Sequence, residues 1–93
     1  MIRTFADRRT EELYRGGRSS RFPSELARRA VRKLEYIDLA SSLDDLRVPT
    51  GNRLHALHRE REGQHAIAIN ASWRICFRWE DGDAFDVEVT DYH

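Results

Sequence analysis

Cysteine is nearly absent from this sequence of 93 residues, in which Cys76 is the only one. A single cysteine excludes an intramolecular disulfide and a zinc site built from several cysteines, so a cytoplasmic location is expected. Long apolar runs are also missing: none approaches the roughly 18 residues that a membrane-spanning helix needs, and no apolar signal-peptide core follows the first residues. No repeat, linker or low-complexity tract interrupts the chain, and residues 1–93 are expected to form a single domain.

Net charge is missing as well, because 16 basic and 16 acidic residues cancel. The two signs are nevertheless separated along the chain. Residues 1–33 contain ten Arg or Lys and four Asp or Glu, a balance of +6, so residues 34–93 carry −6. A local positive field acts at close range whatever the total charge is, and the basic third therefore favours an anionic partner. The alternative is a solvated helix surface that arginine keeps soluble.

Two helices are predicted in the first half of the chain. Asp7 is a suitable N-cap for a helix that runs to Tyr14 and is stopped by Gly16-Gly17. Ser24 is the expected N-cap of a second helix, which ends at Ser41-Ser42. Apolar residues of this second helix recur at spacings of three and four and so share one core-facing side: Ala27, Ala30, Val31, Leu34 and Ile37.

The second half of the chain has the pattern of strands. A short β-branched segment at residues 2–5 is a further strand candidate. Four segments of strand length are separated by turn residues, which is typical of an antiparallel meander: residues 53–58, 65–69, 73–79 and 84–89.

The register of the last hairpin can be predicted because directly paired residues point to the same face of a sheet. A two-residue turn at Asp81-Gly82 would pair Phe77 with Asp86, which is poor patterning. A three-residue loop at residues 80–82 pairs Phe77 with Phe85 instead, and this is the register that we predict.

The preceding hairpin follows from the same rule. A loop at residues 70–72 pairs Ile69 with Trp73 and Ile67 with Ile75. The face to be covered by the helices then collects Ile67, Ile69, Trp73, Ile75, Phe77, Phe85, Val87 and Val89. The opposite, open face collects Ala66, Ala68, Arg74, Cys76, Arg78, Asp86, Glu88, Thr90 and Tyr92, with Arg74 opposite Glu88. The predicted fold is α+β, with two N-terminal helices packed on one face of a mainly antiparallel β-sheet.

Side chains suited to chemistry gather at Asp91-Tyr92-His93, where a carboxylate, a phenol and an imidazole follow one another. Cleavage of RNA without a metal requires a base for the 2′-hydroxyl proton, an acid for the leaving 5′-oxygen and cations for the phosphate charge. An imidazole serves as base or acid near neutral pH. Arg74 suits the phosphate, and Tyr92 can stack on a base. We place this site at the rim of the sheet, beside His55.

A metal site is the alternative use of the same residues. His55 and His58 are three apart, which puts them on opposite faces of a regular strand and makes them a poor chelating pair. Together with Asp91 and His93 they still offer ligands of the right type for zinc or manganese. Acid–base chemistry is the favoured hypothesis, and no cofactor is expected.

Four stretches form a recognisable pattern: residues 2–5, 53–57, 69–79 and 80–93. Its most specific parts are the motif Asn-x-x-Trp-Arg-Ile-x-Phe at residues 70–77 and the closing Asp-Tyr-His. The pattern resembles the HigB-type toxins, also called plasmid maintenance system killer proteins, of the RelE/ParE superfamily. The resemblance covers essentially the whole chain. It implies the RelE-like microbial RNase toxin fold and a type II toxin–antitoxin system. The implied activity is that of an mRNA interferase, a ribosome-dependent endonuclease that cuts the message in the A site without a metal.

The resemblance also implies roles for particular residues. His55 and His93 are the leading acid–base candidates, and Asp91 orients or assists an imidazole. The family commonly has a lysine three residues after the first histidine, a place that His58 occupies here. The complete set of implied catalytic residues is His55, His58, Arg74, Asp91, Tyr92 and His93.

Partners follow from the same resemblance. They are a HigA-like helix-turn-helix antitoxin, operator DNA only through the toxin–antitoxin complex, and the ribosome with its mRNA; no membrane is involved. Docking on ribosomal RNA would use Arg8, Arg9, Arg28, Arg29, Arg32 and Lys33. Two other functions stay open: a ParE-like toxin that poisons DNA gyrase without chemistry, and an inactive homologue retained for regulation.

Overall fold

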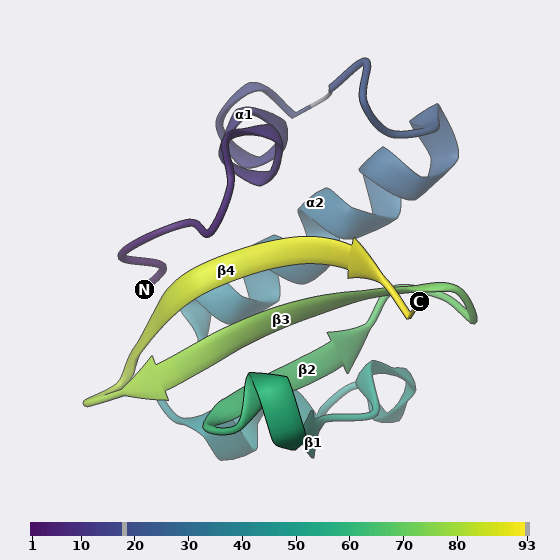
Figure 1. Ribbon diagram of the computed structural model, residues 1–93. Coiled ribbons are helices and arrows are strands. Elements are labelled where there is room, and N and C mark those ends of the chain that lie inside the picture. Colours follow the sequence, from purple (N-terminus) through teal and green to yellow (C-terminus); the bar gives the residue numbers. More distant parts are fainter. Residues whose placement is uncertain (18, 93) are drawn as a thin grey trace.

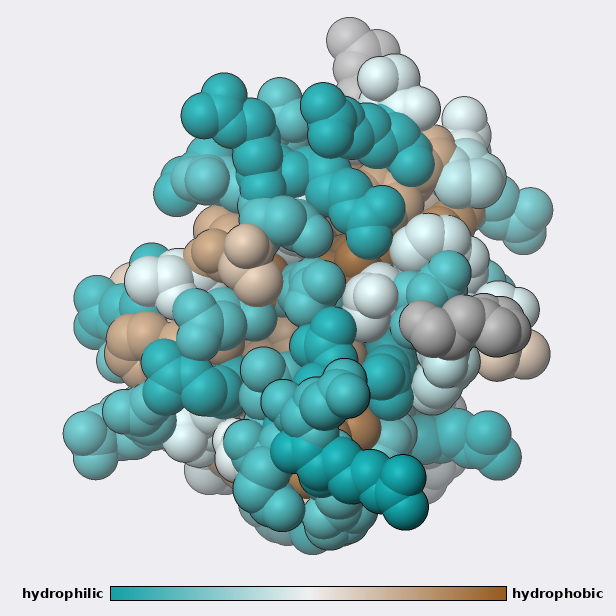
Figure 2. Space-filling view, viewed as in Figure 1, coloured by the Kyte–Doolittle hydropathy of each residue, from teal (hydrophilic) through white to brown (hydrophobic). Residues whose placement is uncertain are grey.

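Helices and sheet form two layers in the computed structural model, which describes residues 1–17 and 19–92 (Figure 1). The helices lie above and behind the sheet in this view, whereas the short coil η3 lies in front of it. The same view with filled atoms is largely hydrophilic, with small apolar areas (Figure 2). The elements, in order, are α1 (Arg8–Gly16), α2 (Ser24–Leu39), η1 (Leu43–Arg47), η2 (Thr50–Asn52), β1 (His55–Ala56), η3 (Arg59–Arg61), β2 (Gln64–Ala68), β3 (Trp73–Glu80) and β4 (Asp83–Asp91), where η marks a 3₁₀ turn.

Helix α1 begins and ends as its sequence predicts. The carboxylate of Asp7 accepts a hydrogen bond from the Thr10 amide at 2.8 Å, and Gly17 closes the helix with φ of 74°. The N-cap predicted for α2 is wrong, because Pro23 holds that position and Ser24 is the first helical residue. The fixed φ of proline directs the chain into the helix without a side-chain cap. Within residues 1–17 and 19–92, no helix has the length and apolarity needed to cross a membrane.

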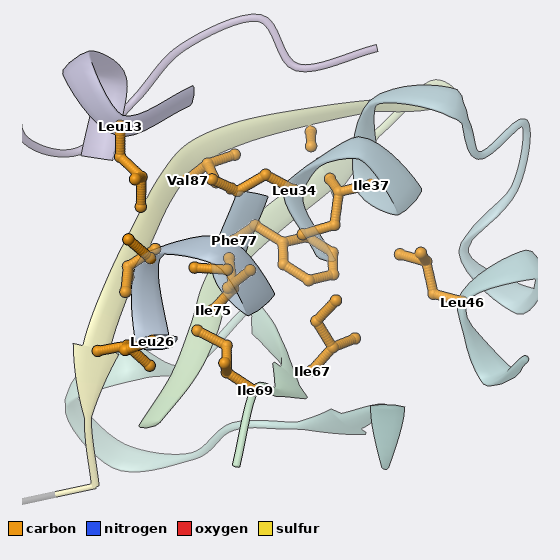
Figure 3. Packing of buried hydrophobic residues seen from close by; sticks show 14 of the residues in the cluster. Leu13, Leu26, Leu34, Ile37, Leu46, Ile67, Ile69, Ile75, Phe77 and Val87 are labelled. Atoms are coloured by element: carbon orange, nitrogen blue, oxygen red, sulfur yellow. The ribbon is translucent and has the colours of Figure 1, made fainter. Parts of the chain in front are cut away.

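Helix α2 covers one face of the sheet, which is called the inner face below. Leu34 and Ile37 are fully buried and lie over Phe77, Ile75 and Ile67 of the strands (Figure 3). The predicted apolar side of α2 is confirmed, with Val31 only partly buried. Burial of one such side chain contributes about 1.5–3 kcal/mol. The helix therefore shields the whole centre of the sheet from water.

The sheet is an antiparallel meander in the order β1-β2-β3-β4. The predicted register of the middle hairpin is confirmed: Ile67 is opposite Ile75, and the Ile69 amide donates to the Trp73 carbonyl at 2.9 Å. Residues 2–5, a predicted strand candidate, do not form a regular strand. Ile2 and Phe5 instead make isolated parallel bridges with β4.

The predicted register of the last hairpin is wrong. Glu80 is opposite Asp83, so the turn has the two residues Asp81 and Gly82, at φ of 51° and 85°. Cys76 is paired with Glu88 and Arg78 with Phe85, which leaves one residue of β3 facing two of β4.

This β-bulge resolves the poor patterning that argued against the short turn. Asp86 takes a left-handed φ of 54° and absorbs the extra residue. Val87 and Val89 consequently point to the inner face, together with Ala84. Phe85 lies on the other side, with the Arg78 guanidinium 5.7 Å from its ring centre.

The outer face of the sheet, opposite α2, is less open than predicted. Ala66 and Cys76 are fully buried there because Leu57, from the β1–β2 connection, packs on them. Because of the bulge, Arg74 is opposite Thr90, and the predicted pair of Arg74 with Glu88 is wrong.

Candidate active site

The outer face carries an open hollow of about 540 Å³ close to the end of β4. It is formed by the β1–β2 connection, by β3 and by the residue after β4. Among the residues expected from the sequence to be catalytic, it brings together His58, Arg74 and Tyr92. In the described part of the chain, the residues that line it are Leu57, His58, Arg59, Glu60, Arg61, Arg74 and Tyr92.

Arg74 lies at the base of this hollow on β3. Its guanidinium carbon is 5.0 Å from the centre of the Tyr92 ring, within the range of a cation–π contact. Its Nε is buried and has no hydrogen-bond partner among residues 1–17 and 19–92. A buried donor without a partner costs about 1–3 kcal/mol, so this arginine is poised to gain an acceptor.

Tyr92 is fixed through its backbone while its ring stays accessible. Its amide donates to the Ser72 carbonyl at 3.1 Å, and the residue is 40% exposed. Asp91 is the last residue of β4 and is opposite Trp73, so it points away from the face of Arg74 and does not line the hollow. His93 lies outside the described residues.

His55 is on the same face but at the other edge of the sheet. It is exposed, it is opposite Ala66, and its Nδ1 lies 2.8 Å from the Arg53 carbonyl oxygen. Three strand steps of about 4.8 Å separate its backbone from β4. The sequence was expected to place His55 beside Asp91 and Tyr92. The structure instead separates them by the width of the sheet.

His58 precedes η3 and is exposed at the mouth of the hollow. Its Nδ1 is 4.0 Å from a carboxylate oxygen of Glu62. The strand predicted for residues 53–58 is shorter than expected, because Arg53 takes a left-handed φ of 51° before β1.

Three residues of the hollow were missed by the sequence analysis: Arg59, Glu60 and Arg61. Arg61 donates from Nη1 to the side-chain oxygens of Glu88, at 3.1 Å, and of Gln64, at 3.0 Å. The available signal was the charged run His-Arg-Glu-Arg between two strands. Charged residues on a long helix are commonly its solvated face, whereas this run lies in a short connection between two strands.

A second hollow, of about 310 Å³, lies along α2. Four of the residues expected to bind RNA surround it together with Tyr36: Arg28, Arg29, Arg32 and Lys33. The Lys33 amine donates to Oδ1 of the fully buried Asn52. Burial, and then the charges of Arg29 and Arg32, lower the pKa of Lys33 from its ordinary value. An anion placed here would relieve this repulsion.

The two remaining residues of that set lie on α1 and differ from each other. Arg8 is exposed. Arg9 donates to the Val89 carbonyl at 3.1 Å, and its guanidinium carbon lies 4.8 Å from the Phe22 ring centre and 6.0 Å from that of Trp73. Arg9 therefore contacts the end of β4 as well, and its expected contact with RNA stays a prediction.

Metal ligands are not gathered in the described part of the chain. Within residues 1–17 and 19–92, no group of three or more His, Cys, Asp or Glu side chains is arranged to hold a metal ion. The alternative set of ligands included His93, which lies outside those residues.

Comparison with known proteins identifies the family. The model of the family described as "RelE-like toxin of type II toxin-antitoxin system HigB" matches residues 3–93. The chain belongs to the HigB-like toxin family. The resemblance seen in the sequence is thereby confirmed, and membership of a toxin–antitoxin family implies an antitoxin partner.

Two curated HigB relatives match over nearly the full length. Toxin HigB-1 of Vibrio cholerae serotype O1 is 36% identical over 87 residues, which are 92% of this chain and 92% of the relative. A protein of Proteus vulgaris named Endoribonuclease HigB is 33% identical over 93 residues and is covered completely, as is this chain.

A solved structure supports the fold of this HigB-like chain. A histidine-to-glutamine mutant of YafQ from E. coli aligns with 99% of this chain and 94% of its own, with a TM-score of 0.56 and 12% sequence identity. The predicted α+β fold is confirmed.

Proposed function

We propose that this HigB-like toxin is a ribosome-dependent endoribonuclease that cuts mRNA in the A site by metal-independent acid–base chemistry. Family membership and the name of the relative from Proteus vulgaris, Endoribonuclease HigB, support the ribonuclease activity. The observation that carries the proposal is the hollow in which Arg74, with its unpartnered Nε, lies under Tyr92 and near His58. A guanidinium beside an accessible aromatic ring suits a phosphate and a base of single-stranded RNA.

The proposed reaction is a transesterification. A base removes the 2′-hydroxyl proton, the 2′-oxygen bonds to phosphorus, and the bond from phosphorus to the 5′-oxygen breaks. An acid protonates this leaving oxygen, and the products are a 2′,3′-cyclic phosphate and a 5′-hydroxyl end. Both proton transfers fit imidazole near neutral pH.

His55 and His93 are the proposed acid and base, and Asp91 orients one of them. Arg74 and His58 stabilise charge on the phosphate oxygens, and Tyr92 stacks on a base. The acid and the base act on the same phosphodiester, and β1 lies three strand steps from β4, so the scissile phosphate would have to lie on the outer face between His55 and the end of β4. The exposure of His55 and His58 on that face is compatible with such a position.

Cleavage on programmed ribosomes tests this proposal. Purified toxin is added to ribosomes with a defined codon in the A site, in buffer containing the Mg²⁺ that ribosomes require, and the ends of the message are mapped. New ends within the A-site codon, with a cyclic phosphate, are expected. Intact message together with a defect in DNA supercoiling would instead support the gyrase-poisoning alternative, and absence of both effects would support an inactive regulatory homologue.

The basic hollow on α2 is proposed as the contact with ribosomal RNA. Reversal of Arg28, Arg29 and Arg32 to Glu should weaken ribosome binding steeply, because each phosphate contact adds about 0.9 to the salt slope of the affinity. The same triple variant should still bind the antitoxin, for which we propose a HigA-like helix-turn-helix protein. Unchanged ribosome binding at low salt would contradict the footprint.

A further inference from the structure

The connection that carries η3 is fastened across the sheet. Arg61 reaches Glu88 of β4 at 3.1 Å and Gln64 of β2 at 3.0 Å, and the side chains of Arg61 and Glu88 are only 30% and 24% exposed. Glu88 is three residues before Asp91 on the same strand. The pair thus joins the segment of His58 to the strand that leads to Tyr92, although β3 lies between them.

Arg59, in the same connection, differs from Arg61 in its exposure and in its contacts. It is exposed, it lines the hollow, and within residues 1–17 and 19–92 it makes no ion pair. Its φ is 61°, a left-handed conformation that residues other than glycine rarely adopt. Strain of this kind persists only where the surrounding structure fixes it, and it concentrates at functional positions.

The charge of the hollow favours an anion. Among residues 1–17 and 19–92, three arginines line it, against one carboxylate, that of Glu60. Glu88 is occupied by Arg61, and Glu62 lies near His58. Arg59 and Arg74 are therefore the two guanidinium groups of the hollow that have no carboxylate partner among the described residues.

We propose that the η3 connection is a phosphate-binding element for single-stranded RNA. Arg59 contacts a backbone phosphate beside the one that Arg74 takes. Arg61 is a positioning residue that holds the connection through Glu88 and Gln64. This inference rests on the proposed function, in that the RNA strand is the message.

Binding to ribosomes that carry an uncleavable message tests the role of Arg59. The message has a 2′-deoxynucleotide at the cleavage site, and toxin affinity is measured over a series of salt concentrations. Arg59→Gln should weaken binding about ten- to hundredfold and reduce the salt slope by about 0.7, the value for one contact with a single strand. The control is Arg47→Gln, which removes an exposed arginine paired with Asp44 at 2.7 Å on η1 and should change neither quantity.

Glu88→Gln separates positioning by Arg61 from direct binding by Arg61, because the two roles predict opposite signs. If Arg61 positions the connection, loss of the Glu88 charge slows cleavage and weakens binding. If Arg61 binds phosphate itself, the same change frees a cation and strengthens binding, which would overturn the positioning role.

A double variant and a matched pair complete this test. The double variant Arg61→Gln, Glu88→Gln should cleave no more slowly than either single variant. Arg61→Lys keeps the positive charge and should cleave faster than Arg61→Gln. The control pair is Arg78→Gln with Asp86→Asn, which removes a 2.8 Å ion pair on the same face outside the hollow. Unfolding midpoints of all variants show whether a loss is only structural.

Failure of this inference and failure of the proposed function give different results. If the wild type cleaves the message but Arg59→Gln has the same affinity and salt slope as Arg47→Gln, the inference is overturned and the proposed function is retained. Binding that depends on Arg59, with an intact cleavable message in the wild-type reaction, supports the inference and overturns the function. Absence of binding and of cleavage by the wild type overturns both.

Discussion

The two faces of the sheet are built from alternating residues of the same strands, yet they differ in almost every property. On the inner face, Ile67, Ile75 and Val87 are fully buried under α2. On the outer face, half-buried Arg74 lines an open hollow, and half-buried Glu88 forms an ion pair with Arg61 of that hollow. Substitutions on the inner face should therefore act through stability, whereas those on the outer face should act through binding and chemistry.

Loss of the proposed acid or base should have the largest effect. We expect His93→Ala to reduce single-turnover cleavage about a hundred- to ten-thousandfold, the usual contribution of general acid–base catalysis. Deletion of residues 91–93 should abolish toxicity. Thermal unfolding of His93→Ala should match the wild type, and a fully toxic deletion variant would contradict the proposed site.

Two phenylalanines on adjacent strands make the comparison directly. Phe77→Ala removes a fully buried ring from the inner face and should lower the free energy of unfolding by about 3–5 kcal/mol. Phe85→Ala removes a partly exposed ring from the outer face and should cost about 1 kcal/mol. Urea unfolding measures both. Equal losses would contradict the register, because both rings would then share the inner face.

The bulge that keeps Val87 and Val89 on the inner face depends on Asp86. Asp86→Val places a β-branched residue at φ of 54° and should destabilise the protein by about 1–3 kcal/mol. Asp86→Gly accepts that conformation and should cost less, even though it removes the ion pair with Arg78. If valine were tolerated as well as glycine in urea unfolding, the left-handed position would not be needed.

The smallest effect is expected from Tyr14, which packs against the core from α1. Burial, and then its 2.9 Å hydrogen bond to Asp38, raise the pKa of Tyr14 from 10.0 to about 12. Because the folded state holds this proton more tightly, the stabilisation is complete below pH 10 and is lost as the pH rises from 10 to 12. Urea unfolding at about pH 9 and about pH 11 should show a larger loss for the wild type than for Tyr14→Phe, with cleavage at neutral pH unchanged.

The comparison also separates what the sequence predicts from what it does not. The helices and the hairpin at residues 70–72 follow from apolar periodicity and turn composition, which are local signals. The last hairpin does not, because a left-handed aspartate shifts its register and no glycine marks the place. Charge alone also does not reveal that Arg9, which is expected to bind RNA, packs on the rings of Phe22 and Trp73.

The site shows the same division. Motif resemblance selected Arg74 and Tyr92, which share a face and meet in the hollow. It did not select Arg59 or Arg61. Arg61 is positioned by hydrogen bonds to Gln64 and Glu88 that only the folded chain forms. The separation of His55 from β4 follows from the meander order that the sequence predicted, and the expected position of the site beside His55 disagreed with that order.

The bridges between residues 2–5 and β4 affect the order in which the chain folds during its synthesis. The amides of Arg3 and Ala6 donate to the carbonyls of Ala84 and Val87 at 2.8 and 2.9 Å, so residues that are synthesised early pair with a strand that is synthesised late. Contacts this distant in sequence form late and slowly. During translation, β4 must leave the exit tunnel before this edge can close or the hollow can assemble. Assembly of the hollow therefore has to wait for a strand that is synthesised late.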